Sequence, residues 1–146
     1  GMMAVQWPVF EGVIAQVDFE ETRTGWRAVS KEFAPHRDRY EQDYRVMVET
    51  LRDYMRKTGL KKVLLGLSGG IDSAMVATME ADALGPDNVR CVMLPSEYTS
   101  HGSLGDAEAV AHALDAPLAT VPISGPRAAI TAAHAPFFQG EPSGIS

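Results

Sequence analysis

A glycine-rich segment between an apolar run and a helical pattern constrains this chain more than any other feature. Residues 62–67 (KVLLGL) form a short apolar run, which predicts a buried strand. Residues 68–73 (SGGIDS) follow directly. They lead into a predicted helix over 71–84 that is rich in Ala and Met and is stopped by Gly85 and Pro86. A strand, a tight turn and a helix in succession are typical of an α/β domain with a parallel sheet.

Strands and helices continue to alternate beyond this segment. Further elements are predicted over 89–94 (strand), 103–114 (helix), 118–123 (strand) and 127–138 (helix). Ser103 and Asp106 offer a capping box at the start of the first of these helices, and Pro122 weakens the last strand. Strands that recur after helices indicate βαβ units, and therefore a parallel sheet with right-handed crossovers.

The part of the chain before residue 39 has a different character. Residues 40–58 carry apolar side chains at helical spacing with a charged opposite face, which predicts an amphipathic helix. Residues 13–19 are compatible with a strand, whereas 22–35 have mixed polarity and no clear period. We expect 1–38 to be a leader or interdomain segment and 39–146 to belong to the α/β domain that carries the glycine-rich segment.

Composition excludes several classes of partner. The net charge of −6 and the isoelectric point near 5.1 argue against binding to nucleic acid or to an acidic membrane surface. Cys91 is the single cysteine, so an intramolecular disulfide and a zinc site of several cysteines are excluded, and its apolar surroundings predict a buried side chain. No apolar run is long enough to span a bilayer and no signal-peptide layout is present, so a cytoplasmic location is expected.

The loop itself has the residues that a phosphate site needs. Paired glycines let the backbone approach an anion closely, and the helix that follows presents unpaired N–H groups and the positive end of its dipole. Ser68 and Ser73 can donate hydroxyl hydrogen bonds to phosphate oxygens. Asp72 would repel phosphates unless a cation lay between them, which makes it a candidate Mg²⁺ ligand.

Three known loop motifs compete for this segment. A Walker A loop requires a lysine that is absent here, and a Rossmann fingerprint requires a glycine where Ser68 stands. Residues 66–70 (GLSGG) do match the G-x-S-x-G nucleophile elbow of serine hydrolases. Asp115 and His134 follow in the chain order of a hydrolase triad, although few strands precede the serine. This alternative stays open at the level of the sequence.

The motif SGGIDS after a strand resembles the S-G-G-x-D-S signature of the PP-loop ATP pyrophosphatases. The resemblance implies a Rossmann-like parallel sheet with flanking helices, similar to the adenine nucleotide alpha hydrolases and incomplete in this chain. Members of that family use ATP to adenylate a carbonyl or carboxyl oxygen with release of pyrophosphate. A nitrogen or sulfur nucleophile then displaces AMP.

Flanking segments narrow the resemblance to one branch of that family. Residues 51–59 and 66–74 are similar to the start of the synthetase domain of glutamine-dependent NAD⁺ synthetases. Residues 93–100 and 103–107 are similar to the block M-P-S-x-Y-[ST]-S…S-x-x-D-A of the same family. The resemblance covers residues 40–142. It implies adenylation of the nicotinate carboxylate of deamido-NAD⁺ by Mg·ATP, followed by ammonia attack to give the amide.

The resemblance also implies roles for individual residues. Ser68, Asp72 and Ser73 would be catalytic, Asp72 would contribute to Mg²⁺, and Met93 and Leu94 would meet adenine through their backbone. The nucleotide-binding set is Gly66, Leu67, Ser68, Gly69, Gly70, Ile71, Asp72, Ser73, Met93 and Leu94. The loop beyond the second strand, beside the expected ligand site, contains Tyr98, Thr99, Ser100 and His101.

Several expectations concern what lies around this chain. The family implies ammonia from a glutaminase domain or from free solution, and a homodimer. Because the family's synthetase domain continues well past residue 146, we expect this chain to be a fragment whose activity alone is open. A non-catalytic nucleotide-binding or interaction module is the alternative that the same residues allow.

Overall fold

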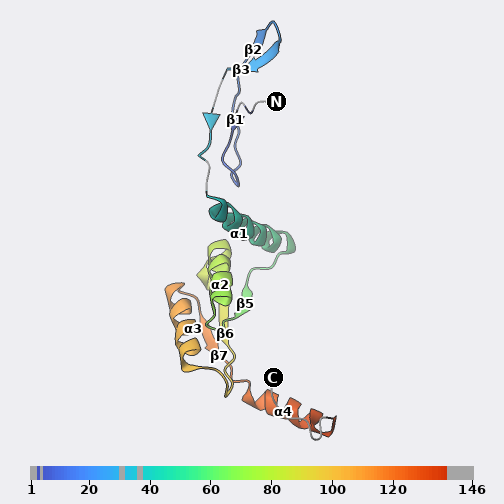
Figure 1. Ribbon diagram of the computed structural model, residues 1–146, viewed down its shortest axis with the longest axis vertical. Coiled ribbons are helices and arrows are strands. Elements are labelled where there is room, and N and C mark those ends of the chain that lie inside the picture. Colours follow the sequence, from blue (N-terminus) through green and yellow to red (C-terminus); the bar gives the residue numbers. More distant parts are fainter. Residues whose placement is uncertain (1–2, 4, 30–31, 36–37, 138–146) are drawn as a thin grey trace. The chain divides into compact units, whose positions relative to one another are not determined.

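The computed structural model of the chain describes residues 3, 5–29, 32–35 and 38–137. The chain divides into two compact units, Gly1–Glu49 and Thr50–Ser146 (Figure 1). No helix in the described ranges is both long enough and apolar enough to cross a bilayer.

The first unit contains two pairs of short strands. β1 (Val5–Gln6) runs parallel to β4 (Glu32–Phe33), and β2 (Phe19–Thr22) pairs antiparallel with β3 (Gly25–Ala28). The β2–β3 hairpin turns at residues 23–24 and enters β3 at Gly25, where φ is +121°. The Thr22 hydroxyl donates to the Gly25 carbonyl at 2.6 Å across this turn.

This arrangement corrects the sequence-based expectation for the first unit. The strand predicted over 13–19 is wrong, because only Phe19 of that range lies in a strand. Residues 22–35, which show no period, contain β3 and β4 instead. The side chains of Phe19 and Trp26 are 57% and 71% exposed, so burial imposes no alternation that a pattern could reveal.

The predicted amphipathic helix is confirmed as α1 (Arg39–Thr58). The Asp38 carboxylate caps it by accepting from the Tyr40 N–H at 2.7 Å. Val48 and Met55 are its buried residues. Within the second unit, the Arg52 guanidinium donates to the carbonyls of Asp82 and Ala83 at the end of α2 (Ile71–Leu84). A cation at that position satisfies carbonyls that the helix leaves without partners.

The second unit is built on a parallel sheet, which confirms the predicted α/β class. Its described strands are β5 (Val63–Gly66), β6 (Val89–Met93) and β7 (Leu118–Thr120), in the order β5-β6-β7. α2 and the short helix η1 (Pro86–Asn88) connect β5 to β6, and α3 (His101–Ala113) connects β6 to β7. α4 (Ser124–His134) and η2 (Ala135–Phe137) follow β7.

The core of the second unit lies on one face of this sheet. Val89, Cys91 and Met93 alternate along β6, so their side chains share that face, and all three are buried. Ala77 of α2 and Ala107 and Ala111 of α3 belong to the same cluster, so α2 and α3 both lie against that face (Figure 1). The predicted burial of Cys91 is confirmed. Desolvation raises the pKa of its thiol, and the charge of Glu80 raises it further.

Some predicted boundaries are wrong by a few residues. α3 begins at His101 rather than 103, because the Ser100 hydroxyl caps it by accepting from the Ser103 N–H at 3.1 Å. Ser103 therefore lies within the first turn of α3, and Ser100 is the capping residue instead.

The last strand and helix also differ from their predicted limits. β7 ends at Thr120, and Pro122, which has no N–H to donate, lies outside the strand. α4 begins at Ser124 rather than 127. Residue 138, the predicted end of that helix, lies outside the described residues.

Candidate functional site

The loop predicted to bind phosphate lies at the carboxyl end of β5. The Leu67 N–H donates to the Val92 carbonyl at 2.8 Å and extends the pairing of β5 with β6 by one residue. The chain then turns through Gly69, whose φ of +80° is readily adopted by glycine, and enters α2 at Ile71. This edge of an open α/β sheet is where such folds bind their ligands.

Two serine hydroxyls hold the loop in shape from inside. Ser68 Oγ and Ser73 Oγ are 2.9 Å apart, and Ser73 Oγ donates to the Gly70 carbonyl at 2.9 Å. The N–H of Ser68 is 3.2 Å from Ser73 Oγ, and the N–H of Gly70 is 3.2 Å from Ser68 Oγ. The loop is thus organised by its own side chains, and a hydroxyl that turned toward a phosphate would exchange one of these bonds for it.

The first turn of α2 carries the groups that an anion would meet. Gly70 at its N-cap has no side chain to cap the helix, and the Ala74 N–H makes a helical bond to the Gly70 carbonyl at 3.1 Å. α1 and α3, in contrast, are each capped by a side chain, Asp38 and Ser100. The uncapped N–H groups and the helix dipole make this turn of α2 suited to bind a negatively charged group.

The loop and the start of α3 are in close contact. A Cβ added to Gly69 would lie 2.2 Å from the carbonyl oxygen of Ser103, so only glycine fits at this position. Sequence reasoning placed Ser103 at a helix start and missed its contact with the loop. The one relevant signal was the family block at 103–107, which marks the segment but does not show what it touches.

A cavity of about 250 Å³ opens beside the loop. Its lining residues come from the ends of β5 and β6 and from α3, and they are Gly66, Leu67, Ser68, Val92, Met93, Leu94, Pro95, Thr99, Ser103 and Leu104. The structure thus brings Met93 and Leu94 to the same cavity as the glycine loop. The Met93 carbonyl accepts from the Val121 N–H at 2.8 Å, whereas Leu94 is half exposed.

Asp72 is exposed in the first turn of α2. Within the described ranges, no three His, Cys, Asp or Glu side chains gather as they would in a metal site built by the protein alone. A single carboxylate fits Mg²⁺ that arrives with a polyphosphate, because Mg²⁺ is commonly held by one or two carboxylates together with substrate oxygens and water.

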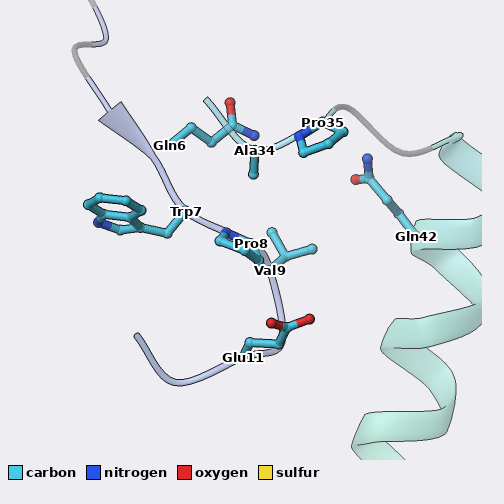
Figure 2. A pocket seen from close by; sticks show the side chains of 8 residues that line it. All are labelled: Gln6, Trp7, Pro8, Val9, Glu11, Ala34, Pro35 and Gln42. Carbon is cyan, nitrogen blue, oxygen red and sulfur yellow. The ribbon is translucent and has the colours of Figure 1, made fainter. Parts of the chain in front are cut away.

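A larger cavity, of about 390 Å³, lies within the first unit and was not predicted from the sequence. Figure 2 shows Trp7, Pro8 and Val9 on one segment, Ala34 and Pro35 on another, and Gln42 on α1. Glu11 supplies the carboxylate of the lining, and Gln6 and Gln42 supply amides. This lining has no glycine loop and includes the carboxylate of Glu11, which would repel a phosphate, so the smaller cavity is the better candidate for a phosphate site.

The geometry argues against the serine hydrolase alternative. An elbow nucleophile sits on a strained turn, but the positive φ here belongs to Gly69 rather than Ser68. Asp115 precedes β7 and so lies at the opposite edge of the parallel sheet from Ser68, which follows β5. His134 Nδ1 is 2.9 Å from the Ile130 carbonyl of its own helix.

Comparison with known proteins identifies the family. The NAD synthase family model matches residues 43–140. A glutamine-dependent NAD(+) synthetase from Rhodobacter capsulatus is 54% identical over 140 residues, which are 96% of this chain and 25% of the relative.

Solved structures agree with this match. A glutamine-dependent NAD⁺ synthetase from Acinetobacter baumannii, in complex with ADP, aligns with a TM-score of 0.75 at 32% identity and covers 86% of this chain and 24% of its own. An NMN synthetase from Francisella tularensis aligns with a TM-score of 0.62 at 27% identity and covers 68% of this chain and 41% of its own. The chain spans about a quarter of the length of the two glutamine-dependent relatives. The family match over residues 43–140, which contains the SGGIDS loop, shows that this chain belongs to the NAD synthase family.

Proposed function

We propose that this chain supplies the ATP-phosphate-binding part of an NAD⁺ synthetase, a ligase that converts deamido-NAD⁺ to NAD⁺. The observation that carries the proposal is the loop 68–73, held in shape by the Ser68 and Ser73 hydroxyls, directly before the uncapped start of α2. The R. capsulatus relative is a glutamine-dependent NAD(+) synthetase and the A. baumannii structure contains ADP, which supports an adenine nucleotide as ligand.

Each loop residue has a physical role in this proposal. The backbone N–H groups at the start of α2 would receive the phosphate oxygens, with Ser68 and Ser73 adding hydroxyl donors. Gly69 and Gly70 keep the backbone clear of side chains where the phosphates would approach. Gly66 and Leu67 line the cavity beside the loop, and Met93 and Leu94, which line it too, would flank the adenine.

The chemistry that such a loop favours is release of pyrophosphate. Attack of the nicotinate carboxylate on the α-phosphorus forms the adenylate, and negative charge develops on the leaving pyrophosphate. The N–H groups and helix dipole of α2 are fixed where they can stabilise that charge without rearranging. Mg²⁺ bound beside Asp72 would supply further neutralisation of the polyphosphate. Ammonia then displaces AMP and completes the amide.

Other parts of the proposal rest on the family resemblance or on the composition and pattern of the sequence. Glutamine or free ammonia as the nitrogen source, a homodimer, a cytoplasmic location, and the absence of nucleic-acid and membrane partners remain predictions. The division into a leader or interdomain segment, 1–38, and an ATP-binding part, 39–146, is also still a prediction. A nucleotide-binding module without catalysis is the second candidate, because the same loop residues could bind a nucleotide without catalysing its reaction.

ATP–pyrophosphate exchange distinguishes these candidates. Because adenylation is reversible, labelled pyrophosphate should enter ATP only when the acceptor is present. We expect exchange with deamido-NAD⁺ and little exchange with nicotinate mononucleotide. The reverse preference would indicate an NMN synthetase, which is how the F. tularensis relative is named. Binding of Mg·ATP with no exchange would favour the module. Labelling of Ser68 by a fluorophosphonate, without ATP affinity, would overturn both.

A further inference from the structure

The segment that leads into α4 runs along the end of β6 and the loop after it. The Val121 N–H donates to the Met93 carbonyl at 2.8 Å, and the Ile123 N–H donates to the Pro95 carbonyl at 3.0 Å. Further along, the Arg127 side chain reaches Glu97 and Tyr98. Three successive contacts therefore attach residues 121–127 to residues 93–98.

Arg127 makes the most elaborate of these contacts. Its Nη1 donates to Glu97 Oε1, and its Nη2 lies 3.4 Å from the Tyr98 hydroxyl. Its Cζ also lies 4.7 Å from the centroid of the Tyr98 ring, within the range of a cation–π contact. One planar guanidinium thus holds two adjacent side chains, a geometry that a lysine ammonium would not reproduce.

The residues that Arg127 holds belong to a well-defined turn. The Ser96 N–H donates to Thr99 Oγ1 at 2.9 Å, and the Thr99 N–H donates to the Ser96 carbonyl at 3.1 Å. The Tyr98 N–H donates to Ser96 Oγ at 3.2 Å. The turn 96–99 is therefore closed by three hydrogen bonds of its own, and its position depends on what anchors it to the rest of the unit.

That position matters because the turn borders the candidate nucleotide cavity. Leu94, Pro95 and Thr99 line the cavity from this side, and Ser68 lines it from the glycine loop. We propose that Arg127 is a positioning residue for nucleotide binding: by holding Glu97 and Tyr98, it sets where Thr99 stands in the cavity wall, next to Leu94 and Pro95, which adjoin the backbone bonds from Val121 and Ile123. This inference rests on the proposed function, because it takes the cavity to be the ATP site.

The contacts of Arg127 are too exposed to contribute much to global stability. Its side chain is 40% exposed and that of Glu97 is 52% exposed, and ion pairs of that kind are weak. Loss of the Arg127 contacts should therefore act locally, by letting the turn 96–99 open more often. Arg56, which pairs with Asp53 on the exposed side of α1, provides a matched control, because its removal also breaks a surface ion pair.

The test combines hydrogen exchange with nucleotide binding on the whole chain. Arg127→Ala should speed amide exchange in residues 94–100 and weaken Mg·ATP binding, each by about fivefold, as expected for losing an exposed ion pair and a cation–π contact together. Arg127→Lys should fall between Arg127→Ala and wild type. Arg56→Ala should change neither quantity, and all variants should unfold at closely similar temperatures.

A charge exchange adds a readout that a structural role would not give. Arg127→Glu alone should weaken Mg·ATP binding, and Glu97→Arg in the same chain should restore part of it. Unchanged exchange in Arg127→Ala would overturn the anchoring role. Faster exchange with unchanged ATP affinity would show that the turn is held but does not serve the nucleotide. If wild type bound no ATP, the proposed function would fail, while the exchange measurement would still decide whether Arg127 anchors the turn.

Discussion

Gly69 in the glycine loop lies against the carbonyl oxygen of Ser103 in the first turn of α3, so closely that an added Cβ would stand 2.2 Å from that oxygen. The backbone of Gly69 also has a φ of +80°, which disfavours any side chain. The shape of the candidate phosphate loop therefore depends on α3, which comes after α2 and β6 in the chain.

Gly69→Ala should consequently destabilise the chain. The strained φ alone should cost about 1–3 kcal/mol, and the clash with backbone should add to it because Ser103 cannot move without shifting α3. Urea unfolding measures the loss. Gly105→Ala is the matched control: nothing lies within 4 Å of an added Cβ there, and alanine within a helix should gain about 0.5–1 kcal/mol. Equal stabilities for the two variants would contradict the contact.

The start of α3 gives a second prediction. The Ser100 hydroxyl accepts from the Ser103 N–H, so Ser100→Ala should cost about 1 kcal/mol of unfolding free energy. Ser103→Ala removes a hydroxyl that lies 2.9 Å from Ser100 Oγ, and it leaves the cap in place, so its cost should be smaller. Thermal unfolding of both variants gives the order. A larger loss for Ser103→Ala would support the capping box first expected at Ser103.

A carboxyl group in α2 gives a third prediction, on pH dependence. Burial raises the pKa of Glu80 above its ordinary value of 4.5, and its Oε2 is buried without a hydrogen-bond partner in the described structure. Because the folded state holds this proton more tightly than the unfolded state, its contribution favours folding at low pH. That contribution is lost as pH rises from about 4.5 through the folded-state pKa.

Glu80→Gln should remove this dependence. The variant should be more stable than wild type at pH 7 and should match it more closely at pH 4, as measured by urea unfolding at each pH. Glu108→Gln, on the exposed surface of α3, controls for the loss of one carboxylate. A stability difference for Glu80→Gln that did not depend on pH would contradict the cause assigned to the shift.

The strand and the helix on either side of the glycine loop could be predicted, because the positions of the apolar residues and of the helix-stopping glycine indicate the same limits. The run at 62–67 is apolar, the helix 71–84 ends at Gly85, and both appear in the structure as expected. The hairpin at Phe19–Ala28 was missed because its apolar side chains face outward, so its register follows from the turn and backbone pairing.

Contacts between distant segments could not be predicted in the same way. The approach of Gly69 to Ser103 and the anchoring of Glu97 and Tyr98 by Arg127 depend on how α3 and α4 meet the loops at the carboxyl ends of the strands. The helix start at Ser100 was missed for a different reason: Ser100 and Ser103 are both good caps, and only the backbone geometry decides between them.

Binding of Mg·ATP and of adenosine to the Asp72→Asn variant tests the central claim most directly, because adenosine has neither phosphates nor the metal they bring. Calorimetry should show the affinity for Mg·ATP reduced by about tenfold or more, with adenosine binding unchanged, as expected when a carboxylate ligand to Mg²⁺ is lost. Asp87→Asn, in η1 at the opposite edge of the sheet, should leave both affinities as in wild type. Equal losses for the two ligands in Asp72→Asn would contradict the phosphate-and-metal role of this loop.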